Sequence, residues 1–309
     1  MATSGENHPW TMGEVDQVQG FTIPARHARG RVVRLGPVLD AILSNHNYPP
    51  SVERVLSEAL ALTALLGSTL KDADGQLTLQ AQTEGGAIDL LVCDYKAGEM
   101  RGYVRHDPDR LAELPVEPSL FALFGKGYLA ITFDQAVSGE RYQGIVPLEG
   151  GSIAEAAEAF FSQSEQIPSL VRIAVSGGGP QGRIAGGLML QHLPEGEEGR
   201  ERLHTRLDHP EWESVVALAQ TVKAEELLDP DLGATTLLWR LFNEEEVRVM
   251  PAAGLARGCR CSPAHIRAVL MRFPEEERAE MLGDDGLIRV DCAFCARTIP
   301  VDPKAGALA

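Results

Sequence analysis

Four cysteines near the end of the chain restrict its possible folds more than any other sequence feature. They form two close pairs, Cys259-x-Cys261 and Cys292-x-x-Cys295, with a long spacer between them. A tetrahedral zinc ion binds four thiolates at about 2.3 Å, and structural zinc sites are commonly built from two such pairs. The first pair has one intervening residue, where a zinc ribbon usually has two. The pattern predicts a small metal-dependent unit at the end of a larger protein.

Composition restricts the partners of that larger protein. The chain has 309 residues, 44% of them hydrophobic, and a formal net charge of -16. The length and apolar content predict a globular protein with one large domain or two unequal ones. The negative charge disfavours binding to nucleic acid or to an anionic membrane, because both attract basic surfaces. The metal unit itself is neutral, with eight basic and eight acidic residues between Leu255 and Ala309.

The start of the chain predicts a cytoplasmic location. Met1 to Gln19 is polar and lacks the basic and apolar regions of a signal peptide, and the chain has no apolar run of transmembrane length. In a reducing compartment, clustered cysteines are more often metal ligands or redox sensors than permanent disulfides.

Changes in composition divide the chain into four predicted parts. Residues 1–19 lack periodicity and are expected to form a mobile tail. Residues 20–195 predict an α+β core domain, in which helices pack on an antiparallel sheet. Residues 196–257 predict a helical linker, and residues 258–309 predict the zinc-binding domain.

The core prediction depends on one long helix and on repeated strand patterns. A helix capped by Ser51 and ending near Lys71 has apolar residues on more than one face, so we expect it to be central and buried. Ser152 and Glu155 predict a capping box for a second helix over 153–162. Alternating segments separated by turn residues predict antiparallel strands at 30–35, 77–81, 87–93, 100–104, 128–133, 142–146, 170–175 and 185–191.

A charged stretch from Glu195 to Glu201 lies at the boundary between the core and the linker. Two helices are then predicted over 212–228 and 235–245, followed by a short strand over 246–250. Their apolar side chains require a surface to pack against; these are Trp212, Val215, Val216, Leu218, Leu227, Leu237, Leu238, Trp239, Leu241 and Phe242.

The metal unit is too small and polar to fold dependably by burial alone. Ser262 and Pro263 begin one predicted helix, Pro274 begins another, and a strand leads into Cys292. Binding of zinc to zinc-finger peptides contributes about 10 to 16 kcal/mol, which is enough to couple folding to the metal. Metal binding and folding of this unit are therefore expected to form one equilibrium.

Other candidate signals favour structural roles. The sequence from Gly177 to Gly182 matches GxGxxG, but a strand pattern follows it, so a hairpin turn is expected instead of a phosphate cradle. His265 lies four residues after Cys261 and could replace a cysteine as ligand, but with four thiolates available it is expected on a helix surface. Cys93 lies in an apolar strand and is expected to act as a small hydrophobe. Glu244 to Glu246 favour a solvated helix end over an acidic pair engaged in catalysis.

The simplest role for the four cysteines is a purely structural zinc site. Their spacing favours a second role, because zinc-bound cysteines are thiolates, the form that oxidants attack, and Arg257 and Arg260 add positive charge nearby. Oxidation would remove the ligands and release zinc. A bridge between Cys259 and Cys261 would close a small strained ring, and strained disulfides are readily reduced. A reversible switch is thus a second interpretation.

The CxC, long spacer and CxxC pattern resembles the redox-regulated 33 kDa heat-shock chaperone family. The resemblance extends from about Gly20 to the end of the chain. Further similar segments are His46-Asn-Tyr-Pro49, Met100-Arg-Gly102, Gly125-Lys-Gly-Tyr128, Gly139-Glu-Arg-Tyr-Gln-Gly144, Ser164-Glu-Gln-Ile-Pro168, Ala185-Gly-Gly187, Leu238-Trp-Arg-Leu241, Glu244-Glu-Glu-Val247 and Asp285-Gly286. The chain departs from the family pattern in its long N-terminal tail and in Ala296-Arg297, where a glycine often follows the last cysteine.

The resemblance implies a chaperone and not an enzyme. It implies one zinc ion per reduced chain, bound by Cys259, Cys261, Cys292 and Cys295. Oxidation would then join Cys259 to Cys261 and Cys292 to Cys295, expel zinc and unfold the linker. The resulting homodimer would hold unfolding client proteins without ATP.

Two alternatives from other classes remain at this stage. A zinc-ribbon interaction or regulatory module would keep constitutive structural zinc, and salt-sensitive binding to nucleic acid would support it. A zinc hydrolase needs an open coordination position, which four cysteines would close.

Overall fold

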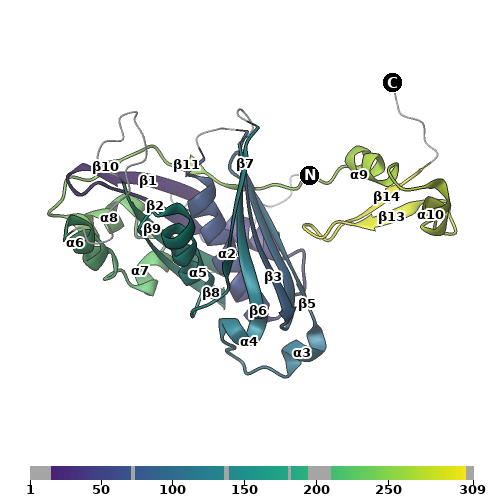
Figure 1. Ribbon diagram of the computed structural model, residues 1–309, viewed down its shortest axis with the longest axis horizontal. Helices are drawn as coiled ribbons and strands as arrows, with labels where there is room; N and C mark the ends of the chain where they lie inside the picture. Colours follow the sequence, from purple (N-terminus) through teal and green to yellow (C-terminus); the bar gives the residue numbers. More distant parts are fainter. Residues whose placement is uncertain (1–14, 71–73, 136–138, 180–181, 194–209, 304–309) are drawn as a thin grey trace, which may run out of the picture.

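The computed structural model describes residues 15–70, 74–135, 139–179, 182–193 and 210–303 (Figure 1). Most of these residues form two antiparallel sheets around one long helix. Three linker helices lie at one end of the molecule, and the four-cysteine unit lies at the other. The chain is therefore of the predicted α+β class. The expected tail over its first fourteen residues and the charged stretch from Glu195 to Glu201 lie outside the described residues.

The first sheet is buried on both faces. Its strand order is β10-β1-β2-β9-β8, and β11 also pairs with β1. Neighbouring residues alternate between the two faces: Val33 and Met189 belong to the central core, whereas Val32 and Leu188 face the linker helices. The strands are β1 (Gln17–Ile23), β2 (Ala28–Leu35), β8 (Ser169–Gly179), β9 (Gly182–His192), β10 (Arg248–Val249) and β11 (Ala253–Gly254).

Strand β1 begins ahead of the residue at which order was expected. Gln17 and Gln19 are polar, but Val18 between them is buried in the central core. The two half-exposed glutamines made this strand hard to recognise in the sequence. Strand β1 pairs with β2, which follows it after a short 3-10 turn, η1 (Pro24–Arg26).

The second sheet is the predicted meander, extended at both edges. Its order is β12-β5-β4-β3-β6-β7, antiparallel except for the parallel pair β12 and β5. One face packs on the central helix through residues such as Leu79, Leu91 and Ile131. The strands are β3 (Gln76–Gly85), β4 (Ile88–Lys96), β5 (Glu99–His106), β6 (Gly125–Asp134), β7 (Arg141–Pro147) and β12 (Ala256–Arg257).

Helix α2 (Pro50–Gly67) is central and buried, as predicted, but its ends differ from the prediction. Its N-cap is Pro49, without a side-chain cap, and Pro50 is the first helical residue. Proline suits this position because its fixed φ is helical and the first turn needs no N–H from it. Ser51 therefore lies inside the helix, and the predicted Ser51 cap is wrong. The helix ends at Gly67, ahead of Lys71.

Shorter helices connect the strands. Ser152 caps α5 (Ile153–Phe160) as predicted, accepting from Glu155 N at 3.1 Å, whereas the Glu155 carboxylate accepts from Gly151 N. Helix α5 continues into a π-turn, η2 (Phe161–Glu165). The others are α1 (Pro37–Leu43), α3 (Pro108–Ala112) and α4 (Leu120–Phe124). The last two are single turns that the sequence analysis did not predict.

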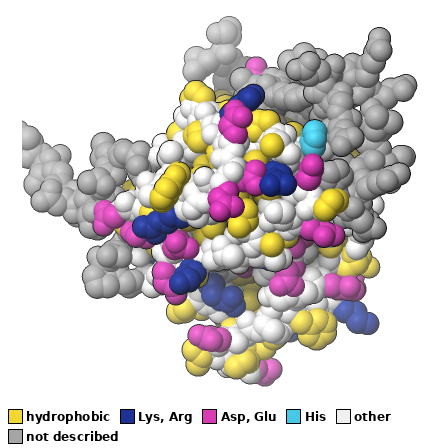
Figure 2. Space-filling view, turned by 90° about the vertical axis from the view of Figure 1, so that its left-hand side faces the viewer, with side chains coloured by type: hydrophobic (Ala, Val, Ile, Leu, Met, Phe, Trp, Pro, Cys, Tyr) yellow, Lys and Arg dark blue, Asp and Glu magenta, His cyan; other side chains and the backbone are white. Residues whose placement is uncertain are grey.

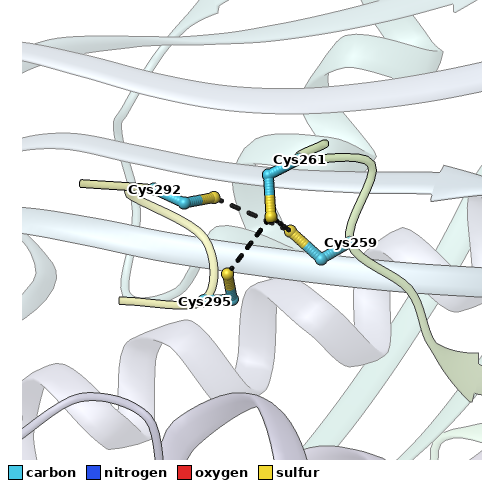
Figure 3. A group of neighbouring side chains, drawn as sticks. All are labelled: Cys259, Cys261, Cys292 and Cys295. Atoms are coloured by element: carbon cyan, nitrogen blue, oxygen red, sulfur yellow. Dashed lines mark hydrogen bonds between the residues drawn. The ribbon is translucent and has the colours of Figure 1, made fainter. Parts of the chain in front are cut away.

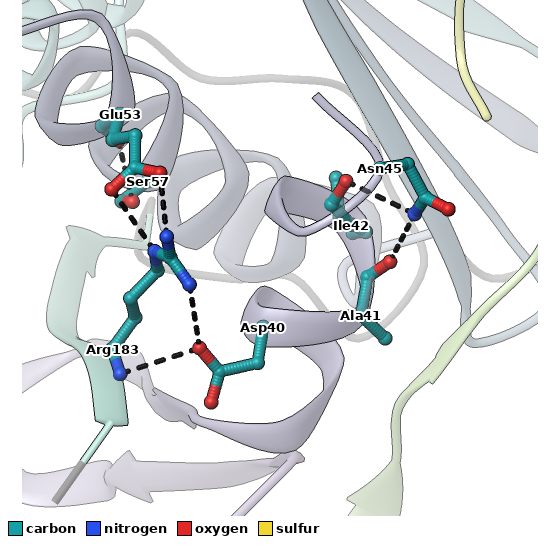
Figure 4. Close-up of polar contacts among 7 residues, drawn as sticks. All are labelled: Asp40, Ala41, Ile42, Asn45, Glu53, Ser57 and Arg183. Carbon is teal, nitrogen blue, oxygen red and sulfur yellow. Dashed lines mark hydrogen bonds and ion pairs between the residues drawn. The ribbon is translucent and has the colours of Figure 1, made fainter. Parts of the chain in front are cut away.

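An ion-pair cluster ties the glycine-rich hairpin to the helices (Figure 4). Arg183 donates two hydrogen bonds to Glu53, at 2.7 and 3.0 Å, and one to Asp40 at 3.3 Å. Gly182 has a φ of 78°, and a Cβ there would lie 2.9 Å from the Asp40 carboxylate. Strands β8 and β9 pair as far as Gly179 and Gly182. The predicted hairpin, without a following helix, is thereby confirmed.

The linker helices pack on the outer face of the first sheet. They are α6 (Pro210–Ala219), α7 (Ala224–Leu228) and α8 (Ala234–Phe242). The prediction of a single helix over 212–228 is wrong, because α6 ends at Ala219 and a separate helix, α7, begins at Ala224. Thr221 donates its hydroxyl to the Leu218 carbonyl, and Glu226 caps the new helix at Lys223 N. Such local side-chain bonds compete with continued helix.

Most predicted apolar linker residues are buried against the sheet, Trp212, Leu238 and Phe242 among them. Trp239 is the exception, because 65% of it is exposed. From the linker side, the described surface shows acidic, basic and scattered hydrophobic side chains (Figure 2). The amphipathic linker thus turns its apolar side inward. In the described part of the chain, we find no helix with the length and apolar character needed to cross a membrane.

Candidate metal centre

The C-terminal unit has little apolar core of its own. Its elements are α9 (Pro263–Leu270), α10 (Glu275–Glu280), β13 (Ile288–Asp291) and β14 (Thr298–Val301). Both helices begin where the prolines predicted, and β13 leads into Cys292 as expected; β14 was not predicted. The buried residues of its apolar cluster are small in number: Leu270, Ile288, Ile299 and Val301.

The four cysteines converge (Figure 3). Their Sγ atoms all lie within 4.8 Å of one another. The Sγ of Cys259 lies 3.2 Å from that of Cys261 and 3.7 Å from that of Cys292, and Cys261 and Cys295 are 3.4 Å apart. A tetrahedral ion with bonds of about 2.3 Å requires sulfurs about 3.8 Å apart. The cluster can therefore hold a metal ion with small adjustments of the side chains.

The second pair forms a tight knuckle. Cys295 N and Ala296 N both donate to the Cys292 carbonyl, at 3.3 and 2.8 Å, and Cys292 N donates to the Arg297 carbonyl. Ala296 has a φ of 53°, the left-handed conformation that glycine adopts more easily. The departure from glycine at this position therefore leaves the knuckle turn intact.

Arg297 supplies the positive charge of the cluster. Its Nε lies 3.4 Å from the Cys295 Sγ, and its Nη2 lies 3.5 Å from the Cys261 Sγ. Burial opposes ionisation of Cys295, but hydrogen bonds from Arg297 and from neighbouring thiols lower the pKa of Cys295 to about 6. Burial and the neighbouring thiols raise the pKa of Cys261 to about 12 and also raise the pKa of Cys292. Without metal, one thiolate is favoured at the expense of its neighbours.

The sequence analysis placed the positive charge on other arginines. One of them, Arg260, interacts electrostatically with Cys259, as expected, while its Nη1 donates to Gln76 of the core at 2.5 Å. The position of Arg297, two residues after the last cysteine, was the available signal. His265 lies outside the group of side chains that could hold a metal, and its backbone N–H donates to the hydroxyl of Ser262, which caps α9.

The knuckle docks on the core through Phe294. The Arg101 guanidinium lies over the Phe294 ring, 3.9 Å from its centroid, and Tyr103 meets the ring edge-on at 4.8 Å. The His46 Nε2 lies 3.3 Å from the Phe294 carbonyl oxygen. We call His46, Gln76, Arg101 and Tyr103 the knuckle socket. The socket holds both cysteine pairs against the core, since Arg260 belongs to one pair and Phe294 to the other.

Replacing Phe294 with alanine is expected to loosen the metal unit from the core without removing a ligand. The aromatic and cation–π contacts together contribute roughly 1 to 3 kcal/mol. Amide exchange at Ala256 and Gly258, which bond the core next to the unit, should accelerate about tenfold, as about 1.4 kcal/mol predicts. Phe273→Ala, an exposed change in the same unit, is the control. Equal exchange in both variants would count against docking through Phe294.

Fold and site together define a class of protein: an α+β core joined through helices to a C-terminal unit whose four thiols can hold a metal ion. Comparison with known proteins narrows that class. The matching family model is described as Hsp33 protein and spans residues 16–302. A 33 kDa chaperonin of Caulobacter vibrioides is 42% identical over 296 residues, which is 93% of this chain and 95% of the relative.

A more distant relative and a solved structure are also similar over most of the chain. A 33 kDa chaperonin of Escherichia coli is 35% identical over 285 residues, which is 92% of this chain and 91% of the relative. The crystal structure of the 33 kDa chaperonin of Thermotoga maritima superposes with a TM-score of 0.77 at 23% identity, covering 94% of this chain and 96% of that one. The chain belongs to the Hsp33 family of heat-shock chaperones.

Proposed function

We propose that this chain is an oxidation-activated, ATP-independent holdase chaperone of the cytoplasm, whose switch is one zinc ion held by the four cysteines. The observation that most supports the proposal is the convergence of four sulfurs within 4.8 Å on a unit with so small an apolar core. Thiolate ligands favour zinc, and their oxidation removes both the metal and the stability that it adds.

Peroxide is the oxidant class that suits these thiolates. Two molecules of hydrogen peroxide take up four electrons and four protons, become four water molecules, and leave two disulfides and a free zinc ion. The disulfides join Cys259 to Cys261 and Cys292 to Cys295. The sulfurs of the first pair are already 3.2 Å apart.

Unfolding of the metal unit affects the linker helices through the segment of chain that connects them. The unit and the linker helices lie at the two ends of the segment from Arg248 to Gly258. Release of the unit leaves that segment without one of its anchors, and the linker helices then separate from the sheet. Their apolar side, with the sheet face beneath, becomes available to unfolding clients and to a second oxidised copy. The resulting dimer binds clients without being an enzyme.

Titration with hydrogen peroxide at mildly raised temperature tests the proposal. Zinc release, measured with a chromophoric chelator, should approach one ion per chain and should parallel the suppression of light scattering by an aggregating client. Reduction with dithiothreitol in the presence of zinc should reverse both. A constitutive zinc module, the competing function, instead predicts the same suppression, or the same lack of it, in the reduced and the oxidised chain.

A further inference from the structure

The segment between α8 and the metal unit seals the edges of both sheets. Met250 N donates to the Gly20 carbonyl and Leu255 N to the Asp16 carbonyl, so the segment covers the outer edge of β1. Ala256 N and Gly258 N then donate to Gly98 and Met100 at the edge of β5. An exposed strand edge presents unpaired N–H and C=O groups to any extended chain. We call residues 248–258 the edge cover.

The edge cover is held mainly by main-chain hydrogen bonds. The residues of β10, β11 and β12 are exposed, and Val249 and Met250 keep 41% and 39% of their surface in solvent. Leu255 is buried in the central core, but one buried side chain gives the segment little affinity of its own. Its attachment therefore depends on the linker helices and the metal unit at its two ends.

The edge cover also fits β1 imperfectly. Thr22 pairs with Arg248, but Val18 pairs with Ala253, so the cover contains one extra residue between the two short ladders. Pro251 lies in that interval and has no N–H to donate. A continuous strand without proline would make more hydrogen bonds with β1 than the chain's own segment does.

An apolar face adjoins this edge. Phe21 and Ile23 of β1 lie in the same buried cluster as Leu188 and Leu190 of β9, beneath the linker helices. The Phe21 ring lies 5.9 Å from the ring of Phe242 on α8. The linker thus covers the main-chain edge and the neighbouring apolar surface together, and its departure uncovers both.

We propose that the uncovered edge of β1 captures clients by accepting an extended, apolar-rich segment of an unfolding polypeptide as an added antiparallel strand. The proposal rests on the linker release described under the proposed function. Main-chain hydrogen bonds do not discriminate between sequences, and apolar side chains at alternate positions add affinity. The combination suits a chaperone that binds many unrelated clients.

Hydrogen exchange resolved to single residues tests the proposal in the full-length chain. In an antiparallel strand, alternate residues direct their N–H groups to the same edge. The Gly20 carbonyl accepts a hydrogen bond from Met250 N of the edge cover. The N–H groups of Val18, Gly20 and Thr22 therefore face the edge cover, whereas those of Gln19 and Phe21 face β2. After oxidation, the first set should exchange at least tenfold faster while the second set stays slow. Permanently unfolded, carboxymethylated α-lactalbumin should then slow the first set again.

Each other outcome overturns the proposal in a distinguishable way. Fast exchange of Val18, Gly20 and Thr22 that persists in the client complex excludes β1 as the capture edge but leaves the switch intact. Continued protection after oxidation, before client is added, overturns linker release as well. Protection that appears without client and rises with protein concentration assigns the edge to a second copy instead.

A pair of substitutions at Thr22 provides an independent test. Proline at this position removes only the N–H that faces the edge cover, and proline is tolerated at strand edges. Oxidised Thr22→Pro should release zinc normally but bind carboxymethylated α-lactalbumin at least tenfold more weakly. Thr22→Val, which keeps the N–H, should bind like the unmodified chain. Equal client affinity of the two variants would exclude main-chain capture at β1. If Thr22→Pro does not fold, the exchange experiment decides alone.

Discussion

Replacing Arg34 with methionine is expected to free the linker helices while all four cysteines stay reduced. Arg34 lies in β2, only 4% exposed, and its guanidinium reaches across to the linker. It donates to the carbonyls of Leu227 and Leu232, both at 2.9 Å, and to that of Glu226 at 3.2 Å. These carbonyls lie at and after the C-terminal end of α7, where helix carbonyls lack partners and favour a positive charge.

The expected effect is large because the contact is buried. Removing the charged partner of a buried network costs about 3 to 5 kcal/mol. Methionine fills a similar volume but donates no hydrogen bond, so the three carbonyls lose their partner. Reduced Arg34→Met should therefore expose its linker to limited proteolysis and suppress client aggregation without peroxide, while its zinc content stays at one ion per chain.

Arg240→Met is the matched control for this prediction. Arg240 lies on α8, is half-exposed, and bonds Glu226 at 3.4 Å on the surface, where ion pairs contribute at most about 1 kcal/mol. The Arg240→Met substitution should leave the reduced chain unable to suppress client aggregation. A reduced Arg34→Met chain with a protease-resistant linker would show that Arg34 does not hold the linker helices on the sheet. An accessible linker without client binding would show that release alone does not activate the chaperone.

Removing the metal is expected to unfold the C-terminal unit. The apolar cluster around Leu270 and Ile299 is small, and zinc contributes about 10 to 16 kcal/mol to comparable peptides. In the reduced Cys292→Ser chain, zinc content should fall at least tenfold. Amides of β13 and β14 should lose their protection against exchange, whereas those of α2 should keep it. Chelation of the unmodified reduced chain should give the same pattern.

Two substitutions act as controls for the metal prediction. Cys93→Ala removes a cysteine from the buried core, and His265→Ala removes the imidazole that lies four residues after Cys261 in the sequence. Both should retain one zinc ion per chain. Loss of zinc from His265→Ala would contradict a site of four thiolates, and a folded, protected unit without metal would contradict the coupling of metal to folding.

The sequence was informative wherever the decisive pattern is local. The periodicity of α2, the alternation of the meander strands and the prolines ahead of α9 and α10 are each contained within a single segment. Asp107 and Ser119 cap α3 and α4, and both residue types are typical helix caps. These helices were not predicted because a single turn is too short to show an apolar periodicity. The break between α6 and α7 depends on side-chain bonds that compete with a continuous apolar pattern.

Contacts between distant segments could not be derived in this way. Arg34 and Leu227 lie 193 positions apart, and a strand arginine gives no sign of its partner. Phe294 is one of two residues between Cys292 and Cys295, and nothing in the sequence indicates that Arg101 and Tyr103 of the core contact it. The grouping of the four cysteines was predictable from their spacing. Their role as zinc ligands, the division into core, linker and metal unit, and the assignment of the disulfides remain proposals.

The fifth cysteine gives the burial of the core a chemical meaning. Cys93 is wholly enclosed on β4, and its sulfur would lie 3.0 Å from a Cβ placed at Gly102. Burial raises its pKa well above that of an ordinary thiol. A thiol that neither ionises nor meets solvent reacts slowly with peroxide and cannot exchange with a neighbouring disulfide. Tight packing around one strand thus keeps Cys93 from bridging to any of the four clustered cysteines. The reversible oxidation proposed for those four requires that the fifth thiol stay unreacted in this way.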